Sequence, residues 1–105
     1  MTHRPDDLHE VWEHSTNGAS LCALINGSVG WLMFLRDDGD AGFSSRNPDY
    51  AGDPTATISY RLVNGQEDSY PASWALPIAT VESALQHFRA TGERPPFVVW
   101  HDDSL

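Results

Sequence analysis

Two short apolar runs, separated by a turn, constrain the fold of this chain more than any other feature. Residues 21–25 and 31–35 are apolar throughout, and Asn26-Gly27-Ser28 lies between them. A helix needs ten or more residues, whereas runs this short between turn-forming residues are typical of buried strands. Because residues 31–35 contain no polar side chain, we expect that strand to be central and covered on both faces. The two runs therefore predict a β-hairpin inside a sheet.

A second hairpin is predicted further along the chain. Ile58, Tyr60 and Leu62 alternate with polar residues, which is the period of a half-buried strand. Asn64-Gly65 follows, and this dipeptide favours the tight turn between two antiparallel strands. We expect the returning strand to cover residues 66–70.

One helix is expected late in the chain, between Pro77, which suits a first helical turn, and Gly92, which suits a helix end. Between them, apolar residues recur at steps of three or four and form one stripe that can cover a sheet. The stripe consists of Ile78, Val81, Leu85 and Phe88. Residues 97–100 are a last apolar run after Pro95-Pro96, and we expect them to form a strand that pairs back into the sheet.

These elements predict a single domain over residues 1–105, of the α+β class, with an antiparallel β-sheet covered on one face by a late amphipathic helix. Residues 4–14 fit a short helix or a strand. Residues 43–54 are rich in turn formers and predict a long loop, and residues 101–105 predict a polar tail that leaves the sheet. The single cysteine, Cys22, lies in an apolar run, so we expect a buried thiol in a reducing compartment.

The charge of the chain favours some partners and excludes others. The 15 acidic residues outnumber the 6 basic ones and give a net charge of −9. Such a surface repels nucleic acid and associates rapidly with a basic protein. All basic residues are arginine, which excludes a phosphate-binding loop ending in lysine and Schiff-base chemistry. The sequence has neither a membrane-spanning run nor a signal-peptide pattern, so we expect a cytoplasmic protein without nucleic-acid or membrane partners.

Three polar clusters could be mistaken for catalytic or metal sites. His9 and His14 are five residues apart, whereas a zinc-protease helix needs a spacing of four. Asp37-Asp38-Gly39-Asp40 fails the register of a calcium loop, which leaves a weak cation site, a solvated turn or an acidic patch. We therefore expect no metal and no cofactor. His101-Asp102-Asp103 supports one alternative function, a small metal-dependent hydrolase, although the sharp Gly-x-Ser-x-Gly turn of many hydrolases is absent.

The large aromatic side chains have two expected roles. Trp31 and Trp100 lie in apolar runs, so we expect them in the core. Trp74 and Tyr50 lie in turn-rich polar segments, where aromatic side chains either fill a core or anchor a protein interface. Both interpretations of these two residues stay open.

Three stretches of the sequence, taken together, resemble a known family. They are GWLMFLRDDGDAGFSSRNP at residues 30–48, YPASWALP at 70–77 and TGERPPFVVWHDD at 91–103. In combination they resemble immunity protein family one of the bacterial polymorphic toxin systems. The resemblance implies a protein made beside a toxin of the nucleic-acid deaminase class, which binds the toxin domain and blocks its active site. The zinc in such toxins belongs to the toxin, so the resemblance implies no cofactor in this chain.

The acid excess and the resemblance together suggest which residues contact the toxin. Acidic loops and an acidic tail would imitate phosphates in a basic substrate cleft, and two aromatic side chains would act as anchors. The expected toxin-binding set is Asp37, Asp38, Asp40, Asp49, Tyr50, Trp74, Asp102 and Asp103. We therefore expect a binding protein rather than an enzyme, with a basic deaminase-type toxin domain as its partner.

Overall fold

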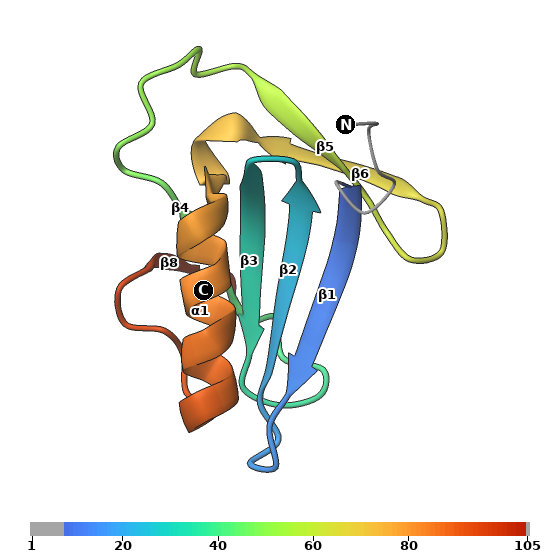
Figure 1. Cartoon of the computed structure of the whole chain (residues 1–105), viewed down its shortest axis with the longest axis vertical. Coiled ribbons are helices and arrows are strands. Elements are labelled where there is room, and N and C mark those ends of the chain that lie inside the picture. Colours follow the sequence, from blue (N-terminus) through green and yellow to red (C-terminus); the bar gives the residue numbers. More distant parts are fainter. Residues whose placement is uncertain (1–7, 105) are drawn as a thin grey trace.

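The computed structural model describes residues 8–104, whose strands form two antiparallel sheets beside one α-helix (Figure 1). The elements, in chain order, are β1 (Leu8–His14), β2 (Ser20–Asn26), β3 (Val29–Leu35), β4 (Phe43–Arg46), β5 (Thr57–Arg61), β6 (Glu67–Pro71), the 3₁₀ turn η2 (Ala72–Trp74), β7 (Leu76–Pro77), α1 (Ile78–Thr91) and β8 (Val99–Asp102). The predicted class, α+β with an antiparallel sheet and a late helix, is confirmed.

The main sheet has the strand order β1-β2-β3-β4-β8, and the short β7 also pairs with β3. The two apolar runs form the expected hairpin β2–β3, in which Leu24 lies opposite Trp31. Gly27 in its turn has a φ of +61°, a left-handed conformation that glycine adopts without strain. Residues 8–14 form a strand that pairs along the whole of β2, which decides between helix and strand for this part of residues 4–14; residues 4–7 lie outside the described residues.

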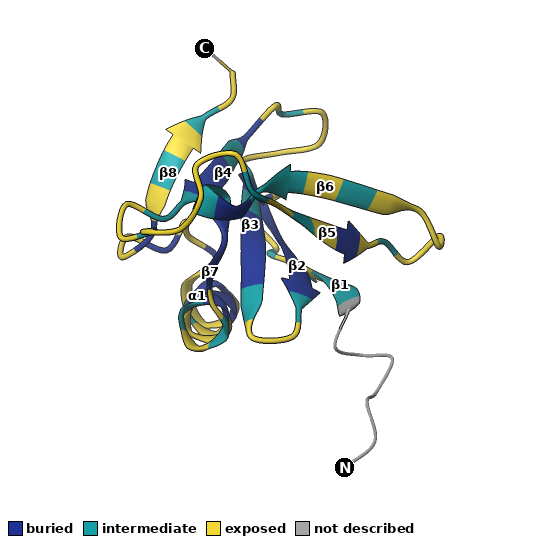
Figure 2. Cartoon of the chain, turned by 90° about the horizontal axis from the view of Figure 1, so that it is seen from above, coloured by how far each residue is buried: buried dark blue, intermediate teal, exposed yellow. Residues whose placement is uncertain are grey.

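Helix α1 covers one face of the main sheet (Figure 2). It begins after Pro77 and ends at Gly92, whose φ is +70° and whose N–H donates to the carbonyl oxygen of Phe88, as the sequence predicts. Trp100 packs against the edge of the core beneath it. This first core cluster consists of Ala19, Leu21, Ala23, Ile25, Leu32, Phe34, Leu76, Val81, Ala84, Leu85, Phe88 and Val98. Within residues 8–104, no helix has the length and apolar character needed to cross a membrane.

The hairpin β5–β6 forms a sheet of its own and packs over the opposite face of the main sheet (Figure 2). Because side chains alternate along a strand, β2 directs Ala23 toward the helix and Leu24 toward the hairpin. The second core cluster consists of Cys22, Leu24, Trp31 and Tyr60, with Met33, Ile58, Leu62, Tyr70 and Trp74 partly buried against it. The sheet therefore has two covers of different kinds.

Residues 43–54 do not form the single long loop that the sequence predicts, because Phe43–Arg46 forms strand β4 between β3 and β8. Ser45 is fully buried in this strand. Its hydroxyl oxygen accepts a hydrogen bond from the Leu32 N–H at 3.0 Å and donates one to the Trp74 carbonyl oxygen at 3.0 Å. The Ser45 side chain can be buried because its hydroxyl is paired with backbone groups. A strand with such a serine is buried although its sequence is polar, so the sequence does not predict it.

The last strand lies two residues later than predicted. β8 covers Val99–Asp102, because its pairing with β4 places Ser44 opposite His101. His101 and Asp102 are therefore strand residues rather than part of a tail. Phe97 lies before the strand and is 52% exposed.

Candidate functional site

The fold brings two predicted acidic groups to the same end of the main sheet. Asp37 and Asp38 are exposed in the β3–β4 loop, and Asp102 and Asp103 come at the end of β8. Pairing of β4 with β8 ties these segments together, and the Asp103 N–H donates to the carbonyl oxygen of Gly42 at 2.9 Å. We call Asp37, Asp38, Asp102 and Asp103 the acidic end.

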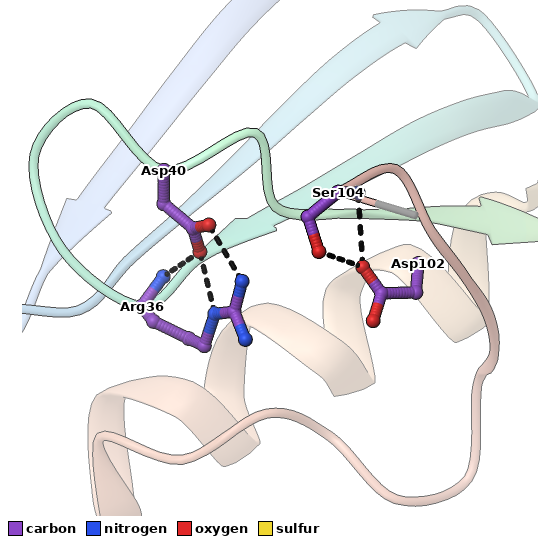
Figure 3. Close-up of polar contacts among 4 residues, drawn as sticks. All are labelled: Arg36, Asp40, Asp102 and Ser104. Carbon is purple, nitrogen blue, oxygen red and sulfur yellow. Dashed lines mark hydrogen bonds and ion pairs between the residues drawn. The ribbon is translucent and has the colours of Figure 1, made fainter.

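Asp40 has a different environment from its neighbours in the same loop (Figure 3). Its carboxylate accepts three hydrogen bonds from Arg36: one from the backbone N–H at 2.9 Å, one from Nε at 2.8 Å and one from Nη2 at 2.7 Å. The bonds from Arg36 hold the pKa of the Asp40 carboxyl well below its usual range. The Asp40 side chain is 7% exposed. Asp40 therefore fixes the loop that carries Asp37 and Asp38.

Asp102 lies beside this ion pair and is held by its own tail (Figure 3). Its Oδ1 accepts hydrogen bonds from both the backbone N–H and the hydroxyl of Ser104. These bonds, followed by the positive charge of Arg36, lower the pKa of the Asp102 carboxyl. The carboxylate is thus stabilised in its charged form next to the β3–β4 loop.

The residues of the alternative hydrolase do not converge on one point. His101 and Asp102 are neighbours in β8, so their side chains leave opposite faces of the strand. His101 Nε2 lies 3.6 Å from Asp103 Oδ1, and both side chains are partly open to solvent. In the described part of the chain, no group of three or more His, Cys, Asp or Glu residues is placed to hold a metal ion.

A groove of about 540 Å³ lies at the opposite end of the β4–β8 pair from the acidic end. Phe97 and Val99 line it and are 52% and 51% exposed. Asp49 also lines it, whereas the Tyr50 hydroxyl donates to the Asp53 carbonyl oxygen at 2.9 Å within its own loop. The full lining is Arg46, Asn47, Pro48, Asp49, Leu76, Pro77, Thr80, Phe97, Val98 and Val99. The groove therefore presents apolar side chains close to one positive and one negative side chain, Arg46 and Asp49.

Trp74 belongs to an aromatic stack. The Trp31 and Tyr70 rings are nearly parallel with centroids 4.4 Å apart, and the Tyr70 and Trp74 centroids are 6.1 Å apart. The Arg46 guanidinium carbon lies 3.8 Å from the Trp74 ring centroid, a cation–π contact. Burial lowers the pKa of Arg46, and the charge of Asp103 opposes that shift. Trp74 thus supports Arg46 at the rim of the groove.

The comparison with protein families gives the chain an identity. The family model described as Immunity protein Imm1 matches residues 2–102, nearly the whole chain. The chain belongs to the Imm1 family. No curated protein matches it. As an Imm1 immunity protein of a toxin system it has a cognate toxin as its partner, and the family that the sequence resembles is confirmed.

Sequence reasoning missed three residues that line the groove of this Imm1 chain. Residues 97–100 are all apolar, which predicts burial of the whole run. β8 instead lies beyond the hairpin cover, so Val99 stays exposed, as does Phe97 before the strand (Figure 2). Arg46 escapes sequence reasoning because its segment, residues 43–54, predicts a loop. An arginine in so acidic a chain is the one feature of the sequence that could have drawn attention to it.

Proposed function

We propose that this immunity protein binds and inhibits a cognate nucleic-acid deaminase toxin by covering its active site with the acidic end and with the groove at the other end of the β4–β8 pair. One observation carries the proposal. Two acidic segments that lie far apart in the sequence meet at one end of the sheet, while apolar side chains stay exposed at the other end of the same two strands. A surface of this kind suits a basic cleft that normally binds a phosphate backbone.

Charge supports the first step, which is association. The net charge of −9 attracts a basic partner over a distance, and the exposed Asp37 and Asp38 concentrate this charge on one loop. Asp40 contributes through Arg36, as a positioning residue for that loop, rather than by contact. Carboxylates in the cleft would take the places of substrate phosphates.

Apolar contacts support the second step, which is retention. Phe97 and Val99 are large, exposed and next to the groove, where a partner would remove them from water. Asp49 adds charge at the rim, with Tyr50 in the same loop. Trp74 holds Arg46 in place for a carboxylate of the partner, because guanidinium groups bind carboxylates with two parallel bonds.

The cellular setting follows from the partner. A toxin that deaminates nucleic acid acts where nucleic acid lies, so the protein protects the producing cell from within the cytoplasm. The chain supplies binding surface and the toxin supplies the zinc. Turnover of a substrate by the purified chain alone would contradict this proposal.

The test uses the toxin encoded next to this gene, with rates of association and dissociation measured by surface plasmon resonance. Asp37→Asn with Asp38→Asn should slow association about tenfold and weaken its salt dependence. The matched control, Glu82→Gln with Glu93→Gln, removes the same charge from exposed positions on and after the helix and should change the association rate less than twofold.

The groove is tested by the dissociation rate. Phe97→Ala should speed dissociation at least tenfold, because it removes an apolar anchor without emptying the core. A cell that carries the toxin should die when this gene is deleted. Survival without the gene, or equal effects of the acidic-end and control variants, would refute the proposal.

A further inference from the structure

A second hollow lies away from the acidic end, between the main sheet and the hairpin. Its volume is about 150 Å³, and Trp12, Trp31 and Tyr70 form aromatic walls around it. Glu10 of β1 and Asp68 of β6 add two carboxylates. Ligand pockets for whole small molecules measure roughly 300–1,000 Å³, so this hollow suits a single side chain.

Each of the two carboxylates accepts hydrogen bonds from two neighbouring residues. Glu10 accepts hydrogen bonds from the Trp12 Nε1 and, at 3.0 Å, from the Val63 N–H in the turn of the hairpin. Asp68 accepts bonds from the Gln66 side chain at 2.9 Å and from the Tyr70 hydroxyl at 3.4 Å. A carboxylate has about four acceptor positions, so each keeps room for a further donor.

The field inside the hollow is negative. Burial, followed by the charge of Glu10, raises the pKa of the Cys22 thiol to about 12. Burial, followed by the charge of Asp68, raises the pKa of the Tyr70 hydroxyl. The charges of the Glu10 and Asp68 carboxylates favour a cation in the hollow, and none of the arginines within residues 8–104 lines it.

We propose that this hollow binds an arginine side chain of the cognate toxin, held by the Trp12 indole and the Asp68 carboxylate. A guanidinium group stacks on aromatic rings and donates in a planar fork to carboxylates, which suits this lining better than the compact ammonium group of lysine. Trp12 is 38% exposed, so a partner can reach it. Trp31 lines the hollow as well, and its Nε1 is buried without a hydrogen-bond partner in the described part of the chain.

The identity of the occupant as a toxin residue rests on the proposed function, whereas the chemistry of the hollow does not. The first experiment therefore uses a small probe, N-acetyl-arginine amide, added to the ¹⁵N-labelled full chain while the indole N–H resonances are followed by NMR. N-acetyl-citrulline amide is the matched probe, because it has the same shape without the charge.

The arginine probe should shift the Trp12 and Trp31 resonances saturably, with a dissociation constant on the order of millimolar. Asp68→Asn should weaken binding about three- to fivefold, and Trp12→Leu, which keeps apolar bulk, should abolish it. Asp38→Asn, at the acidic end, should leave probe binding unchanged. Urea unfolding of each variant would show that the fold is retained.

Three outcomes of the probe titrations would overturn the proposal. The first is equal binding of the arginine and citrulline probes, and the second is an absence of saturable shifts. The third is probe binding that appears only in an Arg4→Ala variant, because the chain's own N-terminal segment would then be the occupant. Each outcome is read from the same indole N–H resonances, with either probe and with the parent chain or the variant.

The second experiment measures dissociation of the toxin complex. Asp68→Asn and Trp12→Leu should each speed it about tenfold. If the probe binds but these variants leave the toxin complex unchanged, the hollow does not receive a toxin side chain and the proposal fails. If they act while the acidic-end variants do not, the hollow stands and the proposed function of the acidic end fails.

Discussion

The two faces of the main sheet have different covers. On one face, helix α1 buries Val81, Leu85 and Phe88 against aliphatic and aromatic side chains, and Ala84 lets the helix lie close to the strands. On the other face, the two-stranded hairpin covers a cluster that contains polar atoms. Two polar atoms of this cluster, the Trp31 Nε1 and the Tyr60 hydroxyl oxygen, are buried without a hydrogen-bond partner in the described part of the chain.

This difference indicates which face contributes more to stability and which face opens more readily. The helix face contributes most of the free energy of folding, because it buries a larger cluster of apolar side chains than the hairpin face. The hairpin face buries a smaller cluster, and Tyr70 and Trp74 remain partly exposed on it. We therefore expect the helix face to determine stability and the hairpin face to open more readily.

The largest effect is expected on the helix face. Phe88→Ala removes a ring that is 2% exposed and meets Phe34 edge to face at 6.1 Å, so the free energy of unfolding should fall by about 3–5 kcal/mol. Urea denaturation followed by circular dichroism measures this loss. A loss below about 1 kcal/mol would mean that the helix is not the principal cover.

The corresponding change on the hairpin face is Tyr70→Ala. It removes a half-buried ring stacked on Trp31 and Trp74, so the loss should be about 1–2 kcal/mol and smaller than for Phe88. Tyr70→Phe is the control, because it keeps the stack and loses a bond of 3.4 Å to Asp68. A Tyr70→Ala loss equal to that of Phe88→Ala would remove the distinction between the faces.

Thiol labelling sharpens the comparison without changing stability. The Cys22 thiol, with its pKa raised to about 12 by burial, reacts only when its cover opens. If the hairpin opens locally, the labelling rate should rise with urea far less steeply than the rate of global unfolding. Equal urea dependences would show that the hairpin opens only when the whole chain unfolds.

The smallest effect is expected outside both covers, at Asp40. Arg36 lowers the pKa of Asp40 in the folded chain, so this carboxyl stabilises the fold above its unfolded pKa of about 4, and the contribution is lost as the pH falls below that value. The urea midpoints of the parent chain and Asp40→Asn should therefore differ most near pH 7 and converge in acid. A difference independent of pH would contradict this.

The sequence predicts the parts of the fold that depend on local patterns. Apolar runs predict β2 and β3, a stripe between Pro77 and Gly92 predicts α1, and Asn64-Gly65 predicts the turn of the second hairpin. β4 escapes prediction because it has four residues and its buried Ser45 is polar. The separate placement of β5–β6 escapes it too, because packing of a hairpin across a sheet is a non-local outcome.

The candidate site, too, is only partly predictable from local sequence patterns. Charge alone suggests the acidic residues, but only the β4–β8 pairing brings Asp102 and Asp103 to the β3–β4 loop. The structure also separates Asp40, which binds Arg36, from its exposed neighbours. Trp74 is a partly buried member of a stack, a role that composition cannot distinguish from that of an exposed anchor.

The hairpin β5–β6 pairs within itself, and this has a consequence for how such a chain can vary. Inserting or deleting residues in its turn, near Val63, would alter that ribbon without changing which residues face each other in β1, β2 and β3. The central strands can thus remain constant while the ribbon acquires new lengths and side chains. Related proteins could therefore change the toxin that they bind through the β5–β6 hairpin while they keep the same main sheet.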